Sequence, residues 1–233
     1  MKINFTIPPG IDKRVNTWNE LTHRWAGEEK SAGPCVTLSR EFGCQAYPLA
    51  EALFNRLNEQ DADKTPWTLL DRLLLEKIAI ESGYNKSELE YITHVNPTFQ
   101  SMVTTFLGKA HAEPASVFNY IRKMIRYFAK AGNSIIVGRG GVCLTQDLSN
   151  ALHVRMVAPL SFKVEVVREY LKISEEEAIT HIKTRQKERD EFTRHFTKMD
   201  LSDPHLYHLL INNEKYSVEE MVDIIMGRIG GAG

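Results

Sequence analysis

The sequence contains few cysteines, no long apolar run and almost no net charge. Three cysteines among 233 residues are too few and too scattered for a disulfide framework or a cysteine zinc site, and they favour a reducing compartment. No apolar run approaches the roughly 18 residues that a membrane span needs, and the first residues show no signal-peptide pattern. The balance of Lys+Arg 29 against Asp+Glu 30 argues against a generally basic nucleic-acid-binding surface. We therefore expect a cytoplasmic protein with neither a membrane nor a nucleic-acid partner.

Short apolar runs alternate with helical patterns along the chain. Hydrophobic residues make up 42% of the sequence and charged residues 25%, the balance of a globular protein. The runs that we expect to form strands are 35–39, 67–70, 134–137, 152–158 and 209–212. The segments that we expect to form helices are 49–59, 73–81, 85–131, 161–171, 174–190 and a last one from 217. This alternation predicts an α/β fold whose parallel sheet is covered by helices on both faces.

Several of these helices have identifiable starts or apolar faces. Ser174 with Glu177, and Ser217 with Glu220, have the spacing of a capping box. Inside the long helical segment, apolar residues recur at helical spacing and predict either core packing or a subunit contact; they are Phe118, Ile121, Ile125 and Phe128.

The N-terminal segment carries its own helical pattern. Val15, Trp18, Leu21 and Trp25 form one apolar stripe within 11–29. We expect this helix to pack on the domain or on a second subunit. Residues 1–33 would then be an N-terminal helical extension, and a homo-oligomer could form through it or through the helical segment before residue 131.

Charged residues follow three of the expected strands directly. They lie in Ser39-Arg40-Glu41, in Asp71-Arg72 and in Gly138-Arg139-Gly140. In an open α/β sheet, ligands bind beyond the carboxyl ends of the strands. These residues are therefore stronger ligand-binding candidates than the same types on a helix surface.

Five blocks of sequence, in order, resemble the cytidylate kinase-like family, a branch of the nucleoside monophosphate kinases. They are VTLSREFG at 36–43, LLDRLLLEKIA at 69–79, IIVGRGG at 135–141, VRMVAPL at 154–160 and DPHLYHLLINNEKYSVEE at 203–220. The resemblance implies a three-layer P-loop nucleotide kinase fold in residues 34–233, with a five-stranded parallel sheet of order 2-3-1-4-5. It also implies a helical insertion that binds the nucleoside monophosphate, at about 81–131, and a lid at about 181–205.

The phosphate-binding loop that the resemblance places after the first strand is degenerate. A P-loop of the form G-x-x-x-x-G-K-[ST] wraps phosphates with backbone N–H groups and adds a lysine and a magnesium-binding hydroxyl. Aligned through Gly43, Ala46 stands at the lysine position and Pro48 at the Ser/Thr position. The remaining donor-phosphate candidates are Arg40 and the loop residues Gly43, Cys44, Gln45, Ala46 and Tyr47. A plain strand-to-helix turn is the alternative interpretation.

The resemblance assigns the acceptor side to the next two blocks. Arg139, a planar cation between glycines, would hold the acceptor phosphate, although Gly140 replaces the family's aspartate. An ion pair at the sheet edge is the alternative for Arg139. Asp71 would contact the nucleoside or cap the following helix, and Arg72 would pair with phosphate or with a helix carboxylate.

The segment 184–194 resembles the lid. Arg185 and Arg189 are four residues apart, so they share a helix face and could converge on a transferring phosphoryl group. The alternative is a solvated helix in which Glu188 and Asp190 balance the arginines.

The remaining histidines and cysteines indicate no metal site. His181, His195, His205 and His208 have no accompanying cysteine pair or H-E-x-x-H motif, so exposed lid histidines are expected. Cys35 and Cys143 are expected to be inert in the core. The helix N-terminus beside Cys44 could lower the pKa of that thiol.

The resemblance implies a nucleotide kinase-like phosphotransferase, and the charged residues at the strand ends are consistent with that activity. ATP, with Mg²⁺, would phosphorylate a nucleoside monophosphate (CMP-like) or a related small phosphorylated acceptor; both cofactors are implied by the resemblance alone. Ala46 and Pro48 favour the alternative of a catalytically inactive regulatory protein that binds a nucleotide on a kinase fold. An oligomeric scaffold built on the helical insertion is a third hypothesis.

Overall fold

The computed structural model describes residues 33–60, 65–71, 74 and 114–230. The predicted N-terminal helix, Arg72, and the part of the helical insertion before residue 114 lie outside these residues.

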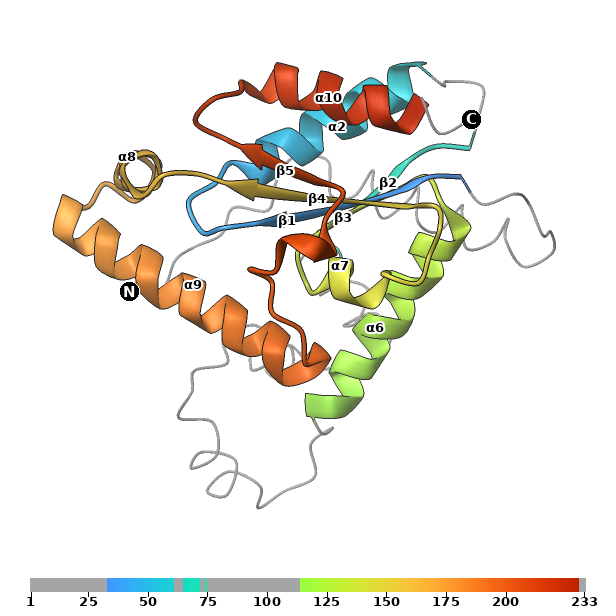
Figure 1. Cartoon of the computed structure of the whole chain (residues 1–233), viewed down its shortest axis with the longest axis horizontal. Coiled ribbons are helices and arrows are strands. Elements are labelled where there is room, and N and C mark those ends of the chain that lie inside the picture. Colours follow the sequence, from blue (N-terminus) through green and yellow to red (C-terminus); the bar gives the residue numbers. More distant parts are fainter. Residues whose placement is uncertain (1–32, 61–64, 72–73, 75–113, 231–233) are drawn as a thin grey trace.

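The core of the molecule is a five-stranded parallel sheet (Figure 1). Its strands are β1 (Cys35–Arg40), β2 (Thr68–Leu70), β3 (Ser134–Val137), β4 (Ala151–Val157) and β5 (Leu209–Asn212). They are arranged in the order β2-β3-β1-β4-β5. The five predicted strands and their order are therefore confirmed. Because all the strands are parallel, their carboxyl ends lie at one edge of the sheet.

Two helices cover one face of the sheet. They are α2 (Ala46–Gln60) and α10 (Val218–Gly230), above the strands in Figure 1. Leu49 and Leu53 of α2 and Ile225 of α10 are fully buried against strand residues such as Val36 and Val154. Since alternate strand residues point to opposite faces, these positions belong to one side of the sheet.

The opposite face is covered by α6 (Pro114–Ala131) and the short α7 (Gly141–Leu144) (Figure 1). The predicted apolar stripe of α6 lies in the core: Phe118, Ile121, Ile125 and Phe128 are all buried. That face of α6 therefore packs within this chain.

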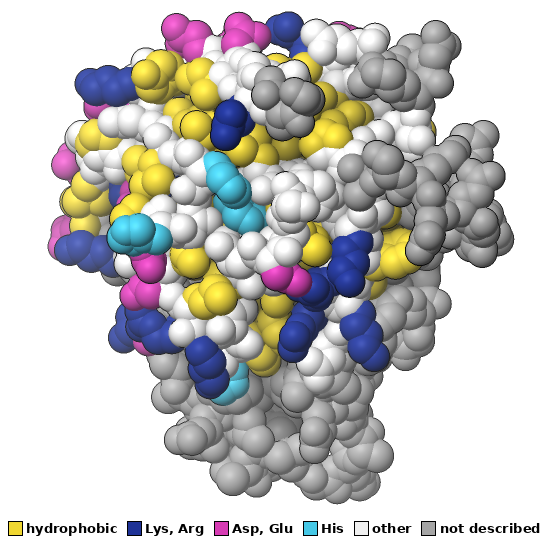
Figure 2. All heavy atoms as spheres, turned by 45° about the vertical axis from the view of Figure 1, so that its right-hand side comes forward, with side chains coloured by type: hydrophobic (Ala, Val, Ile, Leu, Met, Phe, Trp, Pro, Cys, Tyr) yellow, Lys and Arg dark blue, Asp and Glu magenta, His cyan; other side chains and the backbone are white. Residues whose placement is uncertain are grey.

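The outward side of α6 is basic. The helix carries four cationic residues and no acidic one; they are Arg122, Lys123, Arg126 and Lys130. Lys and Arg side chains gather on the lower right of the face in Figure 2, where this side of the molecule comes forward. Arg126 forms a two-pronged pair with Asp147, with N···O distances of 2.7 and 2.8 Å. The net charge of -1 thus conceals a local positive surface.

Two further helices lie beyond the carboxyl ends of the central strands. They are α8 (Leu160–Leu171) and α9 (Glu175–Thr197). Figure 1 shows α9 running from α8, past the strands, to the lower end of α6. The capping box that was predicted at its start is present, because Ser174 Oγ accepts from Glu177 N–H and Glu177 accepts from Ser174 N–H. The helix continues to Thr197, seven residues beyond the predicted end at 190.

The segment after α9 returns to the sheet through the 3₁₀-helix η1 (Pro204–Leu206). At the start of α10, the second predicted capping box is also present, between Ser217 and Glu220. None of the helices within the described part of the chain is long and apolar enough to cross a bilayer.

Candidate functional site: an arginine cavity at the carboxyl edge of the sheet

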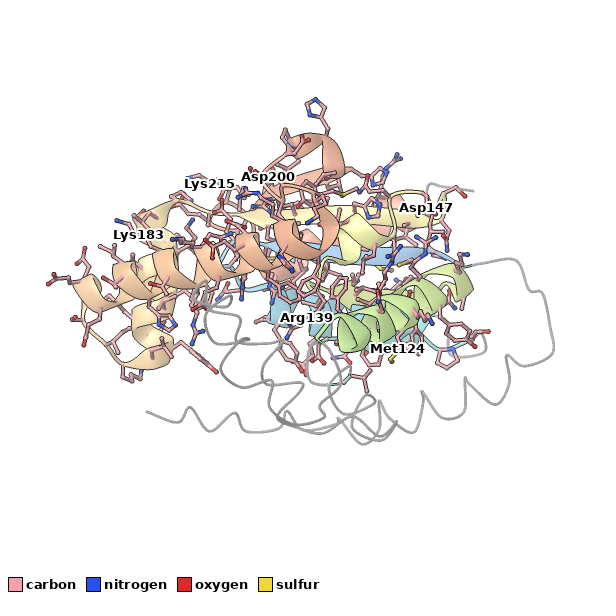
Figure 3. All side chains as sticks on the ribbon, turned by 90° about the horizontal axis from the view of Figure 1, so that it is seen from below. Met124, Arg139, Asp147, Lys183, Asp200 and Lys215 are labelled. Carbon is pink, nitrogen blue, oxygen red and sulfur yellow. The ribbon has the colours of Figure 1, made fainter. Side chains whose placement is uncertain are left out.

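A cavity of ≈ 160 Å³ lies where β1 and β3 end against α9. Three of the five arginines that were predicted as site residues line it: Arg40, Arg139 and Arg189. Figure 3 shows Arg139 between α9 and α6. The other lining residues are Thr37, Leu38, Ser39, Val137, Gly138, Gly140, Gly141, Val142, Glu188, Phe192, Thr193 and Leu201.

The turn after β3 places Arg139 in this cavity. Gly138, Arg139 and Gly140 have φ values of 70°, 56° and 69°, so three consecutive residues adopt the left-handed conformation that only glycine tolerates readily. The turn is held by hydrogen bonds from Gly138 N–H to the Leu38 carbonyl and from Gly141 N–H to the Gly138 carbonyl, both 2.9 Å. The Arg139 guanidinium lies 5.9 Å from the ring centre of Phe192. Left-handed arginine is uncommon, and such strain concentrates at functional sites.

Arg40, the last residue of β1, passes directly over Gly138. A Cβ atom on Gly138 would overlap Nη1 of Arg40, so the glycine makes room for the guanidinium. Burial lowers the pKa of Arg40, whereas the Cys44 thiol and the Asp71 carboxylate act in the opposite direction. Asp71 is itself buried and accepts a 2.9 Å hydrogen bond from Leu74 N–H. Asp71 therefore has the geometry of the predicted helix cap and also supplies negative charge near Arg40.

Arg189 enters the cavity from α9. Its guanidinium lies 4.8 Å from the ring centre of Phe42, and its buried Nη1 atom has no hydrogen-bond partner among the described residues. The pKa of Arg189 is well below its usual value, first because of burial and then because of repulsion from Arg40 and Arg139. Among the described residues, three arginines and one carboxylate, Glu188, thus line the cavity, and Nη1 of Arg189 is a donor without an acceptor. An anion with oxygen acceptors would balance the positive charge and would also accept a hydrogen bond from Arg189.

Arg185 does not line the cavity. It forms a 2.8 Å ion pair with Glu188, one turn along α9. In this structure, Arg185 and Arg189 therefore do not converge on one cavity. Arg189 has the cavity position, and the solvated-helix alternative describes Arg185 better.

The loop between β1 and α2 uses its own N–H groups within the protein. Phe42 N–H donates to Oε1 of Gln186 on α9, and Gln45 N–H donates to Oδ1 of Asn213 after β5, both at 2.7 Å. Two further loop N–H groups donate to carbonyl oxygens inside the loop itself, Cys44 N–H at 3.3 Å and Ala46 N–H at 3.0 Å. These groups are the ones with which a P-loop would hold phosphate.

The loop therefore does not fit the triphosphate of ATP with its magnesium ion. Ala46 and Pro48 offer neither the lysine nor the hydroxyl, and Lys163, which lies against the loop, is paired with Glu41 at 2.7 Å. Gly43, at φ 95°, packs against the Lys163 side chain. Among the described residues, no three His, Cys, Asp or Glu side chains gather as a metal-binding set.

None of the cysteines and histidines in the described part of the chain lines the cavity. The prediction of a lowered Cys44 pKa is wrong, because burial and the Glu41 carboxylate raise it to about 11. The pKa values of Cys35 and Cys143 are also raised by burial. The four histidines contact different partners: His181 packs on Phe42, His195 on Phe196, His205 on Asp203 and His208 on His153.

Several residues around the site were not singled out from the sequence. Ser39 and Phe192 line the cavity, and Gln186 and Asn213 cap the loop. Arg155 is buried beside Ser39. Of these residues, only Arg155 has a feature in the sequence that could have marked it, because it is the one arginine within the apolar run of β4. The other residues have no local sequence signature.

The sheet order and the basic cavity at the carboxyl edge are those of a P-loop-kinase-type α/β fold, whereas the loop after β1 lacks the P-loop lysine and hydroxyl. Residues 35–215 match the model of the cytidylate kinase-like family, and the chain belongs to that family. No curated protein matches the sequence.

Two solved structures are similar to this chain at low sequence identity. An uncharacterized protein from Eubacterium ventriosum is 18% identical, with a TM-score of 0.63 over 85% of this chain and 99% of that chain. Shikimate kinase from Bacteroides thetaiotaomicron is 14% identical, with a TM-score of 0.46 over 84% of this chain and 98% of that one. At these identities, the first similarity establishes the fold.

Proposed function

We propose that this chain binds the phosphate group of a nucleoside monophosphate, or of a related small phosphorylated compound, in the arginine cavity. The observation that carries the proposal is the buried Nη1 of Arg189, which has no acceptor among the described residues and lies with Arg40 and Arg139 around one hollow. Guanidinium groups match phosphate oxygens in geometry and charge. A phosphate would accept from Arg189 and relieve the repulsion among the three cations.

The size of the cavity supports a phosphate rather than a whole nucleotide. Its volume is ≈ 160 Å³, whereas pockets that enclose entire drug-sized ligands measure about 300–1,000 Å³. The phosphate would fill the hollow, and the rest of the ligand would extend out of it. Asp71, which is near Arg40, is the described residue that we assign to the nucleoside side.

Phosphoryl transfer from ATP is the second candidate function, and the gathering of three guanidiniums favours it. The transition state of phosphoryl transfer carries charge over its equatorial oxygens and is stabilised by such cations. In the loop conformation described here, the N–H groups that would hold the donor are occupied by Gln186 and Asn213. Transfer would therefore require these two side chains to leave the loop first. Binding without transfer is the function that the observed loop supports.

Calorimetric titration with inorganic phosphate, CMP and Mg-ATP tests both candidates, together with an assay of ADP formation. We expect CMP or phosphate to bind and Arg189→Met to weaken that binding at least about tenfold, since a charge-assisted hydrogen bond is lost. The matched control is Arg194→Met, which removes an exposed α9 arginine paired with Asp200 and should bind as the unmodified protein does. ADP formation that depends on CMP would establish the second candidate. Absence of binding by all three ligands would refute both.

A further inference from the structure

A fourth guanidinium lies behind the cavity wall. Arg155 is on β4, its side chain is buried, and its residue exposure is 5%. Nη1 donates to the Tyr207 hydroxyl at 3.1 Å and to Ser39 Oγ at 3.4 Å. The guanidinium also lies 5.4 Å from the Tyr207 ring centre. Ser39 lines the cavity, so one residue separates Arg155 from the hollow.

The partners of Arg155 are neutral. Within the described part of the chain, Arg155 forms no ion pair, and its contacts are two hydroxyl groups and an aromatic ring. The Tyr207 hydroxyl is itself anchored by donating to the Leu201 carbonyl at 2.8 Å. A buried cation without a directly paired counterion is costly, and a well-packed apolar side chain of similar size would often be as stable or more stable. Packing alone therefore does not explain an arginine here.

The field of Arg155 reaches the same region as the cavity arginines. Arg155 and Arg189 both favour the ionised form of the Cys44 thiol, and Arg155 also favours that of Asp190 on α9. Asp190 is occupied as the acceptor of a 2.9 Å hydrogen bond from Gln186. This hydrogen bond from a neutral amide leaves the charge of Asp190 in place, so Asp190 offsets part of the field of Arg155. The rest of the field acts on the hollow through Ser39, which accepts from Arg155 and lines the cavity.

We propose that Arg155 is a positioning residue that makes the cavity select a doubly charged phosphate monoester over a singly charged group of the same shape. This inference rests on the proposed function. Arg155 acts from behind Ser39, through its charge. Because the Coulomb energy is proportional to the charge of the ligand, one buried cation favours a dianion more than a monoanion, whereas ligand shape is left to the residues that line the cavity.

Methyl phosphate and methyl sulfate separate charge from shape. Both are tetrahedral esters, but at pH 8 the phosphate is a dianion, since its second pKa is about 6, whereas the sulfate carries one charge. The measured quantity is the ratio of their two dissociation constants, by calorimetry. We expect Arg155→Met to reduce the preference for methyl phosphate about tenfold, and Arg155→Lys, which keeps the charge, to restore most of it. Thermal unfolding reports whether each variant is folded.

Tyr207→Phe removes a hydrogen-bond partner of Arg155 but leaves its charge in place. The preference of this variant for methyl phosphate over methyl sulfate should stay within about twofold of that of the unmodified protein. A tenfold loss of the preference would overturn the charge mechanism in favour of a hydrogen-bond network. A folded Arg155→Met protein with an unchanged ratio would also overturn it. If Arg155→Met does not fold, Arg155→Lys and Tyr207→Phe still decide, because loss of the preference in either contradicts the proposal. If the unmodified protein binds neither ester, the proposed function fails instead.

Discussion

Single residues at the carboxyl edge of the sheet determine whether the arginines share one hollow. Arg139 is held in a left-handed conformation between two left-handed glycines, an arrangement that costs on the order of 1 kcal/mol or more for a residue with a side chain. The same turn leaves space for Arg40 over Gly138. One short segment therefore positions two of the three cations.

Replacement of Gly138 tests this account of the turn. Gly138→Ala adds a Cβ atom at φ 70°, where it overlaps Nη1 of Arg40. We expect the free energy of unfolding to fall by about 1–3 kcal/mol and phosphate binding to weaken, as measured by chemical denaturation and calorimetry. The control is Gly227→Ala in α10, where a Cβ atom would meet nothing within 4 Å. This substitution should raise stability by about 0.5–1 kcal/mol. Equal effects at the two positions would contradict the account.

At the scale of elements, α9 holds the loop between β1 and α2. Three of its side chains act on the loop at Phe42: Gln186 accepts from the backbone N–H, Arg189 lies over the ring, and His181 packs against its edge. The far end of the same helix packs Phe192 and Phe196 against Phe118 of α6. The segment that was predicted as a lid is thus, in this conformation, a helix packed against the loop after β1 and against α6.

Removal of the Gln186 side chain should loosen this contact. Gln186→Ala deprives the Phe42 N–H of its acceptor, and a typical hydrogen bond contributes about 0.5–1.5 kcal/mol. We therefore expect amide hydrogen exchange in residues 42–45 to become roughly fivefold faster. Lys183→Ala, on an exposed position of α9 labelled in Figure 3, is the control and should leave these rates unchanged. Unchanged exchange in Gln186→Ala would show that the helix does not hold the loop through this contact.

At the scale of the whole molecule, the otherwise apolar core contains buried polar side chains on two neighbouring strands, Thr37 of β1 and His153 of β4. Thr37 and His153 are joined by a 2.8 Å hydrogen bond, and His153 stacks on His208 at 5.1 Å. Burial, followed by the neighbouring His208, lowers the pKa of His153 to about 4. The folded protein therefore keeps this imidazole neutral over a range in which an unfolded chain protonates it.

The pH dependence of stability follows from this difference. Between pH 6.5 and about 4 the unfolded state binds a proton that folded His153 does not, so stability falls as the pH is lowered through this range. The loss should amount to at most about 3 kcal/mol, measured by denaturant unfolding at a series of pH values. His153→Gln should flatten the profile there. His205→Gln, which removes an exposed imidazole, should not; a profile that is unchanged by His153→Gln would contradict this assignment.

Local signals in the sequence accounted for much of the fold. Apolar runs located the five strands, and Ser174 and Ser217 marked two helix starts. The stripe of α6, predicted to be either a core face or a subunit contact, lies in the core. These features depend on residues a few positions apart, and for that reason they can be read from the chain. Strand ends likewise placed Arg40 and Arg139 at the same edge of the sheet.

Tertiary packing decided what surrounds those arginines. It brought Arg189 rather than Arg185 into the hollow, and it placed oxygen atoms of Gln186 and Asn213, 144 and 168 residues away, on the loop N–H groups. It also partly buried Cys44 beside Glu41 and so reversed the expected direction of the pKa shift of this thiol. None of these outcomes has a local pattern, because desolvation and long-range hydrogen bonds depend on which distant surfaces meet when the sheet and its helices pack.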